Sequence, residues 1–222
     1  VIIGGGVGGT SGAYHLTQMG WKDVVLLERG ELTCGSTWHS AGLVGQLRSD
    51  FNLTRMMKYS TDLYRRLKEE TGQDTGWREV GGLRLASTPQ RMEELKRQVG
   101  FARSFGMPLE MISTAQAKKM FPLMNDEGVL GAVLTPTDGS IDPTGLTMAL
   151  AAGAKSRGAR IFLDTEVTGI TTKNGQVDEV ITGGKLKIEG GQLAPPPGPG
   201  LGVTLDRNAL AQLHRNYVAC GI

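Results

Sequence analysis

Residues 1–9 have the sequence VIIGGGVGG, in which a short apolar run leads directly into a glycine-rich turn. Gly4, Gly6 and Gly9 satisfy the pattern G-x-G-x-x-G. In this pattern the first glycine permits a tight turn, the second lets the backbone approach a pyrophosphate, and the third lets helix and strand pack closely. The pattern alone is weak evidence, so the sequence around it decides what it means.

The turn lies between a predicted strand and a predicted helix. Residues 7–19 are predicted to be helical up to Gly20, and a second apolar run, residues 23–27, ends at Glu28. Together these segments make a βαβ unit of roughly 30 residues. Glu28 follows Gly9 by 19 residues. At that place a carboxylate accepts hydrogen bonds from ribose hydroxyls and repels a 2′-phosphate, so the unit predicts FAD or NAD rather than NADP. The alternative is a glycine-rich turn in an ordinary α/β protein.

The composition is typical of a water-soluble globular chain. Of 222 residues, 39% are apolar and 21% charged, and the net charge is +2, which gives no strong attraction to nucleic acid. No run of roughly 18 apolar residues predicts a membrane span. The two cysteines, Cys34 and Cys220, are too few for a disulfide framework, and no metal-ligand spacing stands out.

The remaining periodicity predicts a chain of alternating helices and strands. Helices are predicted over residues 52–71, 89–105, 113–120 and 143–156, and strands over residues 79–86, 160–163, 166–170 and 177–181. Asp142 and Pro143 predict an N-cap and a first helical position. Gly81-Gly82 predicts a bulge or a close approach, and Asn174-Gly175 predicts a turn.

The composition changes near Gly183. Residues 183–222 hold 8 of the 33 glycines and 4 of the 9 prolines. Proline-rich sequence forms neither a regular helix nor an inner strand, so residues 195–200 are predicted to be a linker or wrapped loop. One amphipathic helix is predicted over residues 206–219.

The loop after Glu28 is rich in small residues and resembles a known family. The likeness is to the dimethylglycine and sarcosine dehydrogenases, flavoproteins of the D-amino-acid-oxidase superfamily. It is carried by residues 24–28, 32–33, 35–39, 75–77, 81–83, 121–125, 138–139, 141–143 and 146–154. These pieces occur in family order and at family-like spacing over residues 1–182. The resemblance implies a glutathione-reductase-like, Rossmann-type FAD-binding βαβ domain with part of a mixed α+β substrate domain.

The same resemblance implies how FAD is held. His39, in the Ser-Thr-Trp-His piece, would form a covalent bond to the 8α carbon of the flavin. The flavin-contacting loop would be Gly35, Ser36, Thr37, Trp38, His39, Ser40, Ala41, Gly42 and Leu43. Cofactor contacts would also come from Gly4, Gly6, Val7, Gly8, Gly9, Glu28, Arg29 and, through its backbone, Val167.

The implied reaction is oxidative N-demethylation of a small N-methylated amino acid, with hydride transfer to the flavin. The family also includes a regulatory subunit of a phosphatase, so a non-catalytic binding module or an inert fragment is the alternative. Tetrahydrofolate would belong only to full-length relatives. The substrate-binding and catalytic residues are not identifiable, because the segments that supply them in the family are missing.

Residues 186–191 and 199–206 resemble something else, the C-terminal tail of glucarate-dehydratase-type members of the enolase superfamily. The tail has none of that family's metal-binding acids, so sugar-acid dehydration is a less favoured third hypothesis. We therefore expect a partial FAD domain over residues 1–182, with residues 1–50 and about 140–182 on the nucleotide side and about 51–139 on the substrate side. Residues 183–222 would have a different origin.

Four further expectations concern the start of the chain, its compartment and two single residues. Val1 has no initiator Met before it, so we expect a fragment or a processed chain. The dehydratase-like tail favours a bacterial cytoplasm, with the mitochondrial matrix as the alternative. His15, in the first helix, is expected to be structural, and Cys34 is expected to be a small packing residue rather than a redox thiol.

Overall fold

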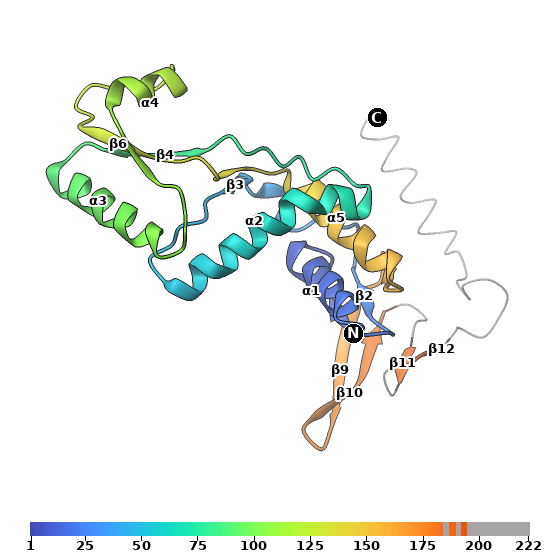
Figure 1. Ribbon diagram of the computed structural model, residues 1–222. Helices are drawn as coiled ribbons and strands as arrows, with labels where there is room; N and C mark the ends of the chain where they lie inside the picture. The colour runs from blue at the N-terminus through green and yellow to red at the C-terminus, as the bar shows by residue number, and fades with distance from the viewer. Residues whose placement is uncertain (184–186, 190–191, 195–222) are drawn as a thin grey trace, which may run out of the picture.

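A three-stranded parallel sheet lies at the end of the molecule that holds the N-terminus (Figure 1). The computed structural model describes residues 1–183, 187–189 and 192–194. The strands are β1 (Ile2–Ile3), β2 (Val25–Leu27) and β8 (Arg160–Phe162), in the order β1-β2-β8. Helix α1 (Val7–Gln18) connects β1 to β2, and α5 (Pro143–Ser156) precedes β8 (Figure 1). The predicted βαβ unit and the α/β class are therefore present.

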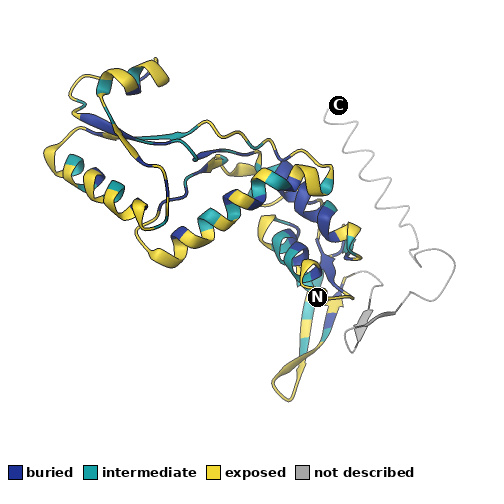
Figure 2. Ribbon diagram, in the orientation of Figure 1, coloured by how far each residue is buried: buried dark blue, intermediate teal, exposed yellow. Residues whose placement is uncertain are grey.

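Strand β2 is buried on both faces, as expected of a parallel sheet. On one face Leu26 packs with Ala13 of α1 and Ala154 of α5. On the other face Val25 packs with Val180. Because side chains alternate along a strand, adjacent residues of β2 serve two different layers. Figure 2 shows this buried centre between α1, α5 and the sheet.

The second layer is an antiparallel sheet. Strands β9 (Val167–Lys173) and β10 (Gln176–Thr182) form a hairpin, and the sheet order is β12-β11-β10-β9. Strands β11 and β12 are Lys187–Glu189 and Gln192–Ala194. Asn174 and Gly175 have φ angles of 53° and 78°, which suits a two-residue hairpin turn. The predicted Asn-Gly turn is confirmed.

A separate antiparallel sheet forms the other end of the molecule, beyond the long helix α2 (Phe51–Thr71). Its strand order is β4-β6-β5. The elements at this end are β4 (Gly82–Ala86), α3 (Pro89–Arg103), β5 (Glu110–Ile112), α4 (Thr114–Met120) and β6 (Gly131–Thr135).

The central strand β6 again has two buried faces. Val133 packs with Leu95 and Ala102 of α3. Ala132 packs with Ala117 of α4. The two helices thus belong to separate small cores on this sheet, and a two-stranded ribbon of β3 (Leu43–Val44) and β7 (Gly139–Ser140) lies closer to α5 (Figure 1).

The sequence located most helix ends correctly. The Asp142 carboxylate accepts hydrogen bonds from the amides of Thr144 and Gly145, both at 3.0 Å, and Pro143 occupies the first turn of α5. These contacts confirm the predicted cap. None of the helices within the described residues combines the length and apolar character that a bilayer crossing requires.

Some strands differ from the prediction. The strand predicted over residues 79–86 begins only at Gly82, because Gly81 has a φ angle of +78°. A Cβ on Gly82 would lie 2.9 Å from Oδ2 of Asp138, and the β4–β6 register is regular, so Gly82 marks a close approach rather than a bulge. The sequence does not predict strands β3, β5, β6, β7, β11 and β12. The predicted linker at residues 195–200 and the helix at 206–219 lie outside the described residues.

Candidate functional site

The glycine turn brings the start of α1 against the end of β1. Gly4 has a φ angle of +104°, and its amide donates to the Leu27 carbonyl at 2.8 Å. A Cβ on Gly9 would lie 1.9 Å from the carbonyl oxygen of Gly4. The turn therefore requires glycine at both positions, one for its backbone angle and one for space.

The first turn of α1 offers unpaired amides beside this loop. The Val7 amide donates to Oγ1 of Thr37 at 3.1 Å. The amides of Gly8 and Gly9 have no acceptor among the described residues. A helix N-terminus with free amides and a partial positive charge suits the phosphates of a nucleotide.

Glu28 lies at the carboxyl end of β2 and is held by the glycine turn. Its Oε2 accepts a 2.5 Å hydrogen bond from the Gly5 amide, and Oε1 accepts a 3.0 Å bond from the Gly30 amide. Burial raises the pKa of Glu28, but the amide hydrogen bonds from Gly5 and Gly30, the Cys34 thiol and the charge of Arg29 together outweigh it, so the net pKa is lower than usual. The side chain is therefore an ionised carboxylate with fixed orientation. Oε1 also accepts from the Cys34 thiol, so Oε2 is the oxygen that keeps a lone pair for a further donor.

A pocket of about 210 Å³ opens at this edge of the sheet. It is lined by Ile3, Gly4, Leu27, Glu28, Arg29, Thr165, Glu166 and Val167. The Thr165 amide donates to the Glu28 carbonyl at 2.8 Å, so the segment after β8 lies beside the end of β2. Ligands of parallel sheets bind outside the carboxyl ends of the strands, which is where this pocket lies.

His39 lies on a short 3-10 turn, η1 (Thr37–His39), next to the start of α1. The Thr37 hydroxyl fixes this turn to the Val7 amide. The imidazole is exposed and stacks on Trp38, with ring centroids 3.8 Å apart and 32° between the ring planes. A ring nitrogen of His39 is therefore open to a ligand that runs past the helix N-terminus.

A second pocket of about 350 Å³ lies where the β3–β7 ribbon meets β4. Leu43, Gly82 and Asp138 are among its lining residues, and Leu43 is 82% exposed. Asp138 is buried, and its Oδ1 accepts a 2.9 Å hydrogen bond from the Gln46 amide. Burial raises the pKa of Asp138, and the Gln46 amide and the charge of Arg84 only partly oppose this.

The predicted cofactor residues are thus distributed over neighbouring parts of one surface. Four of them, Gly4, Glu28, Arg29 and Val167, line the pocket at the sheet edge. The remaining predicted residues lie on the first turn of α1 and on the loop from Gly35 to Leu43, where Ser36, Ser40 and Ala41 are exposed.

Two features of the site differ from the sequence interpretation. Gly5, an unassigned position of the glycine pattern, donates the hydrogen bond to Glu28. Cys34 is exposed rather than packed, and its thiol lies 3.7 Å from Oε1 of Glu28.

His15 is structural as predicted, since its Nε2 lies 2.9 Å from the hydroxyl of Tyr59 on α2. Among the described residues no group of His, Cys, Asp and Glu side chains has the arrangement of a metal site.

The fold and this edge of the sheet define a dinucleotide-binding protein of the α/β class. The model of the family "FAD dependent oxidoreductase" matches residues 1–192. The chain belongs to this family of FAD-dependent oxidoreductases, whose cofactor is FAD.

Several curated relatives are similar over most of the chain. Human mitochondrial dimethylglycine dehydrogenase is 46% identical over 174 residues, which is 78% of this chain and 20% of that protein. Human mitochondrial sarcosine dehydrogenase is 43% identical over 171 residues, 77% of this chain and 19% of that protein. The mouse mitochondrial pyruvate dehydrogenase phosphatase regulatory subunit is 40% identical over 182 residues, 82% of this chain and 21% of that protein. The chain thus spans about a fifth of the length of these relatives.

The fold is also found in solved structures. The crystal structure of L-proline dehydrogenase from P. horikoshii superposes with a TM-score of 0.76 and 32% sequence identity, covering 82% of this chain and 48% of that chain. The fold agrees with membership of the FAD-dependent oxidoreductase family.

Proposed function

We propose that this chain is the cofactor-binding part of an FAD-dependent enzyme that oxidises the N-methyl C–N bond of a small amino acid. The observation that supports this most is the fixed, ionised Glu28 carboxylate beside the open pocket at the sheet edge. Similarity to the dimethylglycine and sarcosine dehydrogenases supports the substrate class. We also propose that the partial FAD domain spans residues 1–182 and that residues 183–222 have a different origin.

The residues at the site fit the chemistry of FAD. The carboxylate of Glu28 can accept from the ribose hydroxyls, while the amides of Gly8 and Gly9 can receive the pyrophosphate. Arg29 and the backbone of Val167 lie at the same pocket and would contact the adenosine end. When bound, FAD supplies the two-electron acceptor for the oxidation, and the protein binds and orients it.

His39 is proposed to attach FAD covalently. A neutral imidazole nitrogen is a suitable nucleophile for the 8α carbon, and the exposed ring of His39 is accessible from solvent. The Thr37 hydroxyl keeps this turn at the start of α1, so the imidazole and the pyrophosphate-binding amides belong to one continuous surface.

The test measures the attachment directly. The purified chain is denatured and washed free of small molecules, and its intact mass and visible absorbance are recorded. We expect a mass increment of one FAD and a yellow colour that survive washing. The variant His39→Ala should lose both, whereas His15→Gln, which changes a histidine on α1 that faces α2, should keep both.

Two results would count against this function. Protein expressed with ample riboflavin that is colourless at the apo mass would overturn the tether. An adduct that persists in His39→Ala would assign the attachment to another residue.

The second candidate function is a non-catalytic binding or regulatory module that keeps the FAD fold. The 40% identity to a phosphatase regulatory subunit favours it. The two functions are separated by adding dimethylglycine or sarcosine to the yellow protein without oxygen. Bleaching of the visible absorbance supports the enzyme. An adduct that never bleaches supports the module or an inert fragment that lacks the substrate-binding segments. The proposed compartment is a bacterial cytoplasm, with the mitochondrial matrix as the alternative because several relatives are mitochondrial proteins.

A further inference from the structure

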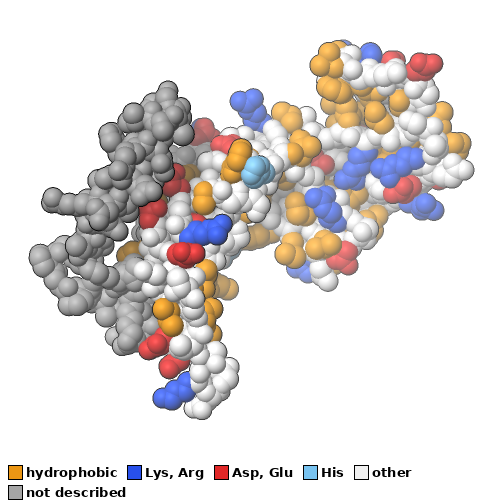
Figure 3. Space-filling view, turned by 180° about the vertical axis from the view of Figure 1, so that it is seen from behind, with side chains coloured by type: hydrophobic (Ala, Val, Ile, Leu, Met, Phe, Trp, Pro, Cys, Tyr) orange, Lys and Arg blue, Asp and Glu red, His pale blue; other side chains and the backbone are white. Residues whose placement is uncertain are grey.

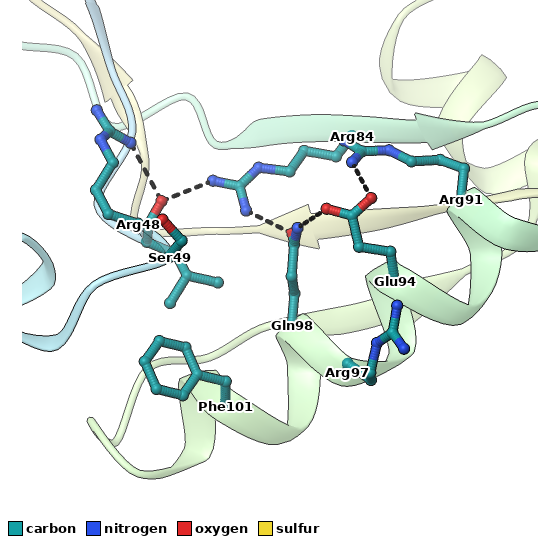
Figure 4. Close-up of a pocket in the computed structure, with 9 residues that line it drawn as sticks. Arg48, Ser49, Arg84, Arg91, Glu94, Arg97, Gln98 and Phe101 are labelled. Carbon is teal, nitrogen blue, oxygen red and sulfur yellow. Dashed lines mark hydrogen bonds and ion pairs between the residues drawn. The ribbon is translucent and has the colours of Figure 1, made fainter.

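A pocket with a basic lining lies at the other end of the molecule, away from the sheet edge that holds Glu28. It has a volume of about 440 Å³ and lies between α3, β4 and the segment after β3 (Figure 4). Its charged lining is Arg48, Arg84, Arg91, Glu94 and Arg97, and Leu47, Ser49, Gln98 and Phe101 complete it. Figure 3 shows Lys and Arg side chains gathered over this end of the molecule.

Arg84 is held in the pocket by neutral acceptors. Its guanidinium donates to Oε1 of Gln98 at 2.9 Å and to the Leu47 carbonyl at 3.3 Å. Gln98 in turn donates from Nε2 to Oε1 of Glu94 at 3.0 Å. These bonds fix the direction of the guanidinium without neutralising its charge.

The acidic side chain of the pocket is already paired. Glu94 forms a 2.7 Å ion pair with Arg91. Arg48 donates to the Leu47 carbonyl at 3.2 Å, again a neutral acceptor, and Arg97 has no hydrogen bond or ion pair within the described part of the chain. Arg84 and Arg97 therefore line one pocket without a hydrogen-bonded or ion-paired carboxylate of their own. The Arg48 guanidinium turns away from Arg84 (Figure 4) and lies beside Gly45 and Asp138 at the edge of the pocket.

Other acids nearby do not cancel this charge. Asp138 interacts electrostatically with Arg84 and Arg48, but it is hydrogen-bonded to the Gln46 amide and lines the other pocket, against Gly82. Glu93 and Glu94 both interact electrostatically with Arg97, but Glu93 is ion-paired with Lys96 and Glu94 with Arg91, each at 2.7 Å. A cleft lined by one sign of charge concentrates counter-ions of the opposite sign.

We propose that this pocket binds a small organic polyanion with two or more carboxylate or phosphate groups and a flat apolar part. Guanidinium groups bind carboxylate and phosphate in a bidentate manner, so several of them favour a ligand with several such groups. Phe101 is 38% exposed and lies at one end of the pocket, which gives the apolar part a surface (Figure 4).

The size of the pocket separates this ligand from smaller and larger ones. Small-molecule pockets occupy roughly 300–1,000 Å³, and this one falls within that range. A single inorganic phosphate would reach only part of the lining, which comes from three separate segments. A long acidic chain would contact the basic surface outside the pocket as well, and its binding would not depend on Phe101.

The test titrates the whole chain with benzene-1,2,4-tricarboxylate, a flat trianion, by isothermal calorimetry. The double variant Arg48→Gln/Arg97→Gln removes two exposed charges that hold no ion pair. We expect it to weaken binding about tenfold to a hundredfold. The matched control Lys96→Gln/Arg103→Gln removes two charges from the exposed side of α3 outside the lining, and should change binding by about twofold or less.

Further ligands test the chemistry of the site. Citrate, a tricarboxylate without a ring, should bind more weakly than the aromatic trianion, and Phe101→Leu should reduce this difference. Pyrophosphate in place of carboxylates tests whether the pocket prefers phosphate, and its binding should show the same dependence on Arg48 and Arg97. Lack of binding by all three probes, or equal losses in the double variant and its control, would overturn the site. Tight binding of polyglutamate with none of the small anions would assign the surface to an acidic macromolecule instead and would also overturn the proposal.

Discussion

The amide of Gly5 donates a 2.5 Å hydrogen bond to Oε2 of Glu28, a residue 23 positions further along the chain. A Cβ on Gly5 would lie 3.0 Å from the Cβ and Cγ of Glu28, so the turn and the carboxylate are in close contact. The second oxygen of Glu28 is held by the Gly30 amide. The acid that is predicted to bind ribose therefore also fastens the glycine turn to the end of β2.

Replacing Glu28 with Gln should reduce the stability of the fold. The variant keeps the size of the side chain but turns an amide NH₂ toward one of the two backbone donors, and it loses the charge. Since hydrogen bonds to charged groups contribute roughly 1.5–3 kcal/mol, we expect the free energy of unfolding to fall by about 1–3 kcal/mol. Urea unfolding measures this. Glu31→Gln, an exposed acid in the same loop, is the control and should be near neutral.

The stability that Glu28 supplies should depend on pH. Its pKa is lowered on folding, so the unfolded chain binds more protons in the interval between the two pKa values. The contribution is complete above the unfolded pKa of about 4.3 and is lost as pH falls through the lower folded value. The stability difference between the native chain and Glu28→Gln should therefore shrink below about pH 4, as unfolding at a series of pH values would show. A difference that grows on acidification would contradict this assignment.

Two neighbouring glycines should respond in opposite ways to alanine. A Cβ on Gly9 would collide with the Gly4 carbonyl, so Gly9→Ala should lower the free energy of unfolding by about 2 kcal/mol or more. A Cβ on Gly8 meets nothing within 4 Å, and alanine favours a helix, so Gly8→Ala should gain about 0.5–1 kcal/mol. Thermal unfolding of both variants measures the contrast. Equal stability of the two would refute the packing argument.

The nucleotide-side unit could be predicted from the sequence because its signals are local. The glycine turn, the helix after it and the acid at the end of β2 lie within the first 28 residues. The same holds for the Asp142 cap and the Asn174-Gly175 turn, where one or two residues determine the backbone.

The missed features depend on contacts between distant segments. Strand β6 is a single short apolar run that becomes a strand by pairing with β4 on one side and β5 on the other. Thr165 reaches the pocket at the sheet edge only because β8 pairs with β2, far away in the sequence. The arginine pocket likewise collects side chains from β4, α3 and the segment after β3, and no spacing in the sequence reveals this.

Replacing Asp138 with Asn should help stability most at neutral pH. Burial raises the pKa of Asp138 despite the opposing Gln46 amide and the charges of Arg84 and Arg48. Because folding raises this pKa, the contribution of Asp138 to the free energy of unfolding is greatest below the pKa of the unfolded chain. That contribution is lost as pH rises through the pKa of the folded chain. Asn can still accept from the Gln46 amide through Oδ1. Relative to the native chain, Asp138→Asn should therefore gain stability between pH 4 and pH 7. Urea unfolding at both pH values measures this difference. A relative loss of stability over that interval would contradict the direction of the pKa shift.

The hydroxyl of Thr135 offers the sharpest test of the core packing. Its Oγ1 is buried on the central strand β6 and has no hydrogen-bond partner among the described residues. A buried polar group without a partner costs free energy, and valine has nearly the same shape, so Thr135→Val should raise the free energy of unfolding by about 1 kcal/mol. Thr61 is equally buried, but its hydroxyl donates to the Met57 carbonyl at 2.9 Å. The matched variant Thr61→Val should therefore lose about 1 kcal/mol, because it removes a satisfied hydrogen bond. Urea unfolding of the two variants side by side measures this contrast. If Thr135→Val lost as much free energy of unfolding as Thr61→Val, the Thr135 hydroxyl would have a hydrogen-bond partner in solution.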